Sequence, residues 1–91
     1  MTQHRDPSDI EEDLKARGLW DLVEEVAKSR YLLTDELLGR GRLAAICLAR
    51  FELWSKLRER TGWGTPQLGL MLGVDHSTIL AGVKRHAKLQ K

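Results

Sequence analysis

Several residues that would place this chain in a familiar class are scarce. A single cysteine among 91 residues excludes an internal disulfide, and the three histidines show no metal-ligand spacing with one another or with that cysteine. No apolar run approaches the roughly eighteen residues of a membrane span, and residues 1–7 lack the apolar core of a signal peptide. We therefore expect a cytoplasmic protein with no metal site and no membrane partner.

The patterns of an enzyme are missing as well. The sequence has no glycine-rich phosphate loop that ends in Gly-Lys-Ser or Gly-Lys-Thr, so no nucleotide is expected. Its serines and its cysteine show no recognisable arrangement with a histidine and a carboxylate, and so small a helical domain offers little cavity from which water is excluded. These absences predict a protein that is not an enzyme and binds no cofactor.

Hydrophobic spacing predicts an all-α fold, a compact domain of about six helical segments. No stretch alternates like a strand, and the 42% of apolar residues suffices for one core. The expected segments are a short acidic helix ending before Gly18, an amphipathic helix over residues 19–27, a single turn over 34–38, a central helix over 43–60, and two helices within 64–83. In domain terms, residues 1–18 are an acidic N-terminal extension, in which Ser8 and Glu11 suggest a capping box, and residues 19–91 are the main domain.

Charge is divided unevenly along the chain, which the net charge of +2 conceals. Residues 1–38 hold five basic against ten acidic residues, giving −5, whereas residues 39–91 hold ten against three, giving +7. A basic C-terminal part suits a partner rich in phosphate. The acidic part is interpreted either as a solvated surface or as a docking surface for a basic partner.

Residues 64–83 match the spacing of a helix-turn-helix. Their sequence is GTPQLGLMLGVDHSTILAGV. The motif needs a small residue where its helices cross, a residue that tolerates positive φ in the turn, and an apolar residue that enters the core. Those three positions are Gly69, Gly73 and Ile79, and the other inward positions are Leu68, Leu72, Val74 and Val83. Pro66 can open the first helix, and Asp75 can cap the second.

The start of the second helix carries the candidate base-reading residues, Asp75, His76, Ser77 and Thr78. In a helix that enters the major groove these positions face base edges, where carboxylate, hydroxyl and methyl groups each have partners. The alternative is an ordinary capped surface helix, because an aspartate followed by hydroxyl residues is common at helix starts. The surrounding twenty-residue pattern favours duplex DNA as the partner.

These residues resemble the C-terminal, DNA-binding domain of the bacterial replication initiator DnaA. The resemblance covers roughly residues 19–88. The matching stretches are Asp75-His76-Ser77-Thr78-Ile79-Leu80, Thr61-Gly62, Thr65-Pro66-Gln67-Leu68-Gly69, Leu37-Leu38-Gly39-Arg40-Gly41-Arg42 and Leu48-Ala49-Arg50. It implies that Arg42 enters the minor groove and that Arg50 grips the DNA backbone. It also implies that Asp75, His76 and Ser77 read bases and that Thr78 contacts the DNA. The remaining candidate backbone contacts are Arg40, Thr65, Pro66, Lys84 and Arg85.

Two positions depart from the family pattern. Gly41 stands where a third basic loop residue is usual, and Phe51 stands where glutamine is usual, which bears on affinity and on the preferred sequence. With no room for the family's ATPase domain, we expect a sequence-specific DNA-binding regulator of transcription or replication that recognises sites similar to those of DnaA. The alternative is an interaction module that docks on an initiator or polymerase, with DNA binding secondary or lost.

Overall fold

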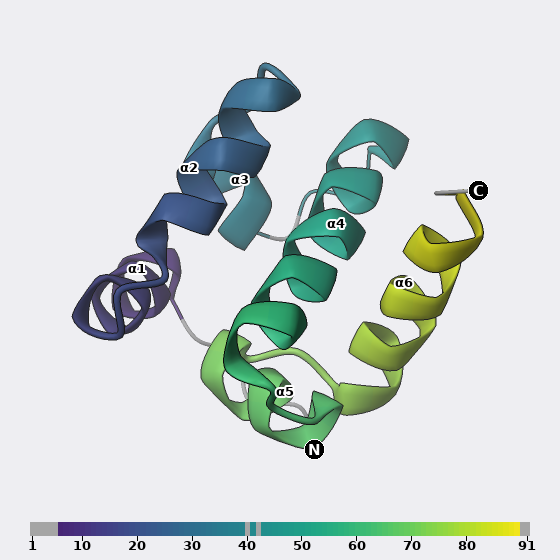
Figure 1. Ribbon diagram of the computed structural model, residues 1–91. Helices are drawn as coiled ribbons and strands as arrows, with labels where there is room; N and C mark the ends of the chain where they lie inside the picture. Colours follow the sequence, from purple (N-terminus) through teal and green to yellow (C-terminus); the bar gives the residue numbers. More distant parts are fainter. Residues whose placement is uncertain (1–5, 40, 42, 90–91) are drawn as a thin grey trace.

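The computed structural model describes residues 6–39, 41 and 43–89, which form a compact all-helical globule (Figure 1). Six helices and no strand are found in this part of the chain, as predicted. They are α1 (Pro7–Ala16), α2 (Trp20–Ser29), α3 (Thr34–Leu38), α4 (Ala44–Thr61), α5 (Thr65–Leu72) and α6 (His76–Leu89). Figure 1 shows α4 running through the middle, with α6 on one side and α2 and α3 on the other.

The first helix begins differently from the prediction. It starts at Pro7, and Asp6 occupies the N-cap position with extended backbone (φ −67°, ψ 143°) and no side-chain capping hydrogen bond. The expected capping box at Ser8 is therefore wrong, because a proline suits the first turn and already places the helix start one residue earlier. The predicted end before Gly18 is confirmed, since the last helical residue is Ala16.

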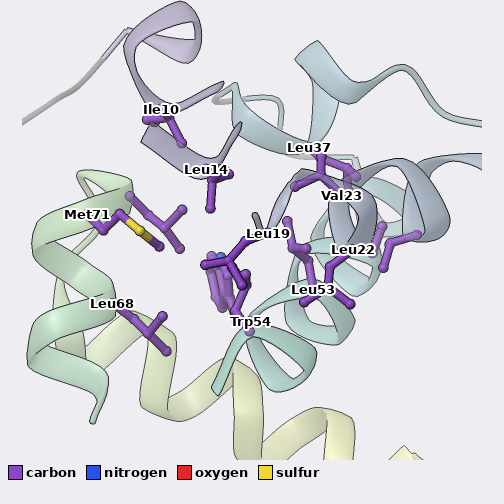
Figure 2. Close-up of a cluster of buried hydrophobic side chains, with 14 of the residues drawn as sticks. Ile10, Leu14, Leu19, Leu22, Val23, Leu37, Leu53, Trp54, Leu68 and Met71 are labelled. Atoms are coloured by element: carbon purple, nitrogen blue, oxygen red, sulfur yellow. The ribbon is translucent and has the colours of Figure 1, made fainter. Parts of the chain in front are cut away.

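Helix α1 is anchored in the same core as the rest of the chain. Ile10 and Leu14 are 2% and 0% exposed and lie among side chains of α2, α3 and α5 (Figure 2). Complete burial of one such side chain is favourable by about 1.5–3 kcal/mol. The sequence does not show what these two apolar residues face; in the structure they close one side of the core.

Ion pairs between α2 and α4 join the acidic and basic parts of the chain. Lys56 Nζ lies 3.0 Å from Glu25 Oε1, and Arg60 Nη2 lies 3.1 Å from Asp21 Oδ2. A third pair has the opposite polarity: Arg30, the residue that follows α2, has its Nε 2.7 Å from Glu52 Oε1 of α4. Two of the cations that the sequence places on the central helix are thus held by carboxylates of α2.

A close crossing of α4 and α6 holds the helix-turn-helix on the rest of the domain. A Cβ atom at Gly82 would stand 2.5 Å from Phe51 Cδ1 and 2.7 Å from Trp54 Cζ3, so both rings lie directly against the α6 backbone. The Trp54 ring is buried in the core. At its C-terminal end α4 stops at Gly62, whose φ of +73° is the left-handed conformation in which many helices end.

Candidate nucleic-acid interface

The helix-turn-helix forms as its spacing predicts. Gly73 ends α5 with a φ of +69°, and a Cβ at Gly69 would lie 2.5 Å from the Val74 carbonyl oxygen. The Val74 amide donates to the Gly69 carbonyl at 3.0 Å, which closes the turn. Ile79 is fully buried beneath α6. All three constrained positions therefore do what the motif requires, and they fix the start of α6 relative to α5.

The first turn of α6 exposes the four predicted base-reading residues, Asp75, His76, Ser77 and Thr78. The Asp75 carbonyl accepts hydrogen bonds from the amides of Thr78 and Ile79, at 3.0 and 3.2 Å, so Asp75 occupies the N-cap position. Its carboxylate oxygen lies 3.8 Å from His76 Nδ1. The turn consequently presents an acceptor, an imidazole and two hydroxyl groups to solvent on one short stretch of helix.

Along α6, the hydroxyl residues share one face with a row of cations. Ser77 and Thr78 line a surface groove whose other lining residues are Phe51, Ala81, Gly82, Lys84, Arg85 and Lys88. Positions four, seven and eleven residues apart lie on one side of a helix, so the groove follows the helix axis. Lys84 and Arg85 are two of the backbone contacts predicted from the sequence. Lys88 was not predicted, although it lies eleven residues after Ser77 and so on the same side of the helix.

Phe51 brings an aromatic ring from α4 to this groove. The ring is partly buried, tilted by 50° against Trp54 at a centroid distance of 5.6 Å, and held beneath Gly82. Together with Ser77 and Thr78 it lines the groove, to which it gives an apolar wall at the position where the resemblance leads us to expect glutamine. Such a wall can pack against a methyl group or a sugar but cannot donate a hydrogen bond.

The first turn of α5 lies next to the helix-turn-helix crossing. Pro66 is exposed, whereas Thr65 is only 9% exposed and packs into the domain. A phosphate near this turn would meet main-chain amide groups at a helix N-terminus more readily than the threonine hydroxyl.

Arg50 lies on α4 with its guanidinium turned toward the protein backbone. It donates hydrogen bonds to the carbonyl oxygens of Glu36 at 2.8 Å, Leu37 at 3.1 Å and Gly41 at 2.6 Å. Burial lowers the pKa of this guanidinium from its ordinary value. A guanidinium has five N–H groups, so the three bonds leave two for any other partner.

Two predicted DNA contacts, Arg40 and Arg42, lie outside the described residues. Their described neighbours are Gly39, which is partly exposed, and Gly41, which is exposed.

None of the helices in the described part of the chain is long and apolar enough to cross a membrane.

Comparison with known proteins finds two similar sequences. No protein-family model matches the chain, and no solved structure matches it. The chromosomal replication initiator proteins DnaA of Tropheryma whipplei strains Twist and TW08/27 are each 36% identical to it over 69 residues. The aligned stretch is 76% of this chain but only 14% of either relative. Over these 69 residues the chain is therefore homologous to the replication initiator DnaA.

Proposed function

We propose that this protein binds duplex DNA sequence-specifically through the first turn of α6, at sites similar to those that DnaA recognises. The observation that carries the proposal is the exposure of residues 75–78 on a helix whose orientation is fixed by the crossing at Gly69 and the turn at Gly73. The homology to DnaA supports the same partner. In the cell we infer a cytoplasmic regulator of transcription or replication that works without catalysis, cofactor or nucleotide.

Base recognition would use the distinct chemistry of each exposed side chain. The Asp75 carboxylate can accept from a cytosine amine, and the Ser77 and Thr78 hydroxyls can bond to a donor or an acceptor. His76 can hydrogen-bond to a base edge or pack on a thymine methyl. Because all four belong to one helical turn, they would read adjacent base pairs on a short stretch of the major groove.

Backbone contacts would come from the cations on the same face of α6. Lys84 and Arg85 are exposed and line the groove that begins at Ser77, whereas Lys56 and Arg60 on α4 are ion-paired with α2. Cations already held by carboxylates attract phosphate less, so we assign the main phosphate attraction to α6. The first turn of α5, with Thr65 and Pro66, and the loop arginines Arg40 and Arg42 complete the proposed contact set.

The deciding experiment is selection of bound duplexes from a random pool, followed by sequencing. We expect enrichment of one short motif by the wild type, and a motif with weaker base preference for the His76→Ala variant. A Glu24→Ala variant, changed at an exposed position of α2 outside the proposed contacts, is the control and should return the wild-type motif. If the wild-type pool is no more enriched than a pool passed over blank resin, the proposed function fails.

A second candidate function is docking on a replication or transcription protein. Asp9 and Glu12 of α1 and Glu24 of α2 are exposed, and these helices lie across α4 from α6 (Figure 1). This function predicts salt-sensitive binding to purified DnaA or RNA polymerase that persists in His76→Ala and is lost when the three carboxylates become amides. DNA selection and this binding assay separate the two candidates.

A further inference from the structure

The groove along α6 changes its chemistry from one end to the other. At the start of the helix it is lined by two hydroxyl residues, Ser77 and Thr78. Toward the end of the helix it is lined by three exposed cations, Lys84, Arg85 and Lys88. The part between them is apolar and is lined by Ala81, Gly82 and Phe51. None of these described lining residues is acidic, so the groove suits a polyanion along its whole length.

Phe51 reaches the apolar part of the groove from α4. A Cβ atom at Gly82 would stand 2.5 Å from Phe51 Cδ1, so the phenyl ring lies beside residue 82, between the hydroxyl residues and the cations of α6. The ring also packs against Trp54, which is buried, at a centroid distance of 5.6 Å. Phe51 nevertheless remains partly exposed. Contacts within the protein therefore use only part of this side chain, and the rest lines the groove.

The order of these three surfaces follows the order of groups on a DNA strand. The first turn of a recognition helix meets base edges, and cations farther along the helix meet phosphates. An apolar surface between them lies where the outer edge of a base adjoins the backbone. The methyl group that base pairs present in the major groove is that of thymine, and apolar side chains such as alanine and phenylalanine are its usual partners.

We propose that Phe51 is a specificity-determining residue: together with Ala81, it contacts the methyl group of one thymine in the preferred site. This inference rests on the proposed function and adds a base contact from α4 to those from the first turn of α6. The phenyl ring has no hydrogen-bonding group, so its selectivity comes from the apolar contact alone. Cytosine and uracil lack the methyl group, and the contact discriminates against both.

The first test removes only the methyl group. In the duplex that the wild-type protein selects, each thymidine is replaced in turn by deoxyuridine, which keeps the same base pair. We expect one replacement to weaken wild-type binding about fourfold, the value for one buried CH₂ group. The same replacement should leave the affinity of Phe51→Gln unchanged, because this variant has already lost the contact. Replacements at other thymidines should act equally on both proteins.

The matched control is Tyr31→Gln, the same change from an aromatic ring to an amide. Tyr31 is 96% exposed in the turn after α2, and α2 lies across α4 from α6 (Figure 1). This variant should respond to every deoxyuridine as the wild type does. Equal responses of wild type and Phe51→Gln at every thymidine would overturn the proposal.

The second test uses the wild-type protein and does not depend on the folding of a variant. Phe51 is the only phenylalanine of the chain, so selective labelling of phenylalanine marks this ring alone. In the complex we expect nuclear Overhauser effects between the ring protons and the methyl group of the thymine that deoxyuridine identifies. Contacts with sugar protons alone would overturn the proposal and assign the ring to the backbone, and the absence of contacts with DNA would assign it to the fold.

The two levels of the argument fail in different ways. If the wild-type protein binds no duplex, the proposed function fails, and this inference fails with it. If the wild-type protein binds a selected duplex but no thymine methyl group affects its affinity through Phe51, the proposed function stands and only the role of Phe51 is overturned.

Discussion

Gly82 of α6 lies against Phe51 of α4 so closely that a Cβ atom at position 82 would stand 2.5 Å from Phe51 Cδ1. The rings of Phe51 and Trp54 occupy the space that a side chain would take, and Trp54 is only 6% exposed. This contact sets the distance between the helix that carries the candidate base readers and the helix that forms the centre of the domain.

The first prediction concerns this contact. Gly82→Ala should lower the free energy of unfolding by about 1–3 kcal/mol, because the added methyl group must displace two packed rings. In an open helix position the same change would stabilise the protein by up to about 1 kcal/mol through helix propensity. Urea denaturation monitored by circular dichroism measures the difference, and a stabilised variant would show that the two helices are not in close contact at this point.

The second prediction concerns the anchorage of α1. Leu14 is fully buried, so Leu14→Ala should lower the free energy of unfolding by about 2–5 kcal/mol. Leu70, which is 76% exposed on α5, is the matched control, and Leu70→Ala should change stability by no more than about 0.5 kcal/mol. Chemical denaturation of both variants tests this, and equal effects would mean that α1 contributes nothing to the core.

The sequence predicted the helix-turn-helix well because its constraints are local. Gly69, Gly73 and Ile79 act within one twenty-residue stretch, where spacing alone determines which residues meet. The burial of Leu22, Val26 and Leu57 follows from helical periodicity in the same way.

The sequence could not predict contacts that depend on the tertiary arrangement. The two buried apolar residues of α1 do not indicate which helices they pack against. The pattern of apolar side chains does not indicate the role of Gly82 either, because glycine has no side chain. The acceptors of Arg50 are main-chain carbonyl groups of α3 and of Gly41, whose positions depend on how these residues lie against α4. Residue spacing alone therefore predicted which residues form the candidate site. The tertiary contacts that hold this site in place could be identified only from the structure.

The third prediction tests base recognition. His76→Ala and Ser77→Ala should each weaken binding to the selected duplex by about 1–3 kcal/mol and leave binding to unrelated duplexes unchanged, because their contacts would be with base edges. Competition titrations with the selected duplex and a scrambled duplex give the affinity of each variant for both. Thermal unfolding serves as the control for folding. An equal loss on selected and scrambled duplexes would assign these side chains to backbone contacts.

The fourth prediction uses two lysines in contrasting surroundings to test where phosphate is bound. Lys84 is exposed in the α6 groove, whereas Lys56 on α4 lies 3.0 Å from Glu25 and 3.9 Å from Glu52. Each phosphate contact contributes about one unit to the slope of log affinity against log salt concentration. Lys84→Gln should therefore reduce the slope by about 1 on every duplex, and Lys56→Gln should leave it nearly unchanged, although both variants lose one positive charge. Equal reductions would indicate a general effect of net charge, and a larger reduction for Lys56→Gln would move the phosphate-binding surface from α6 to α4.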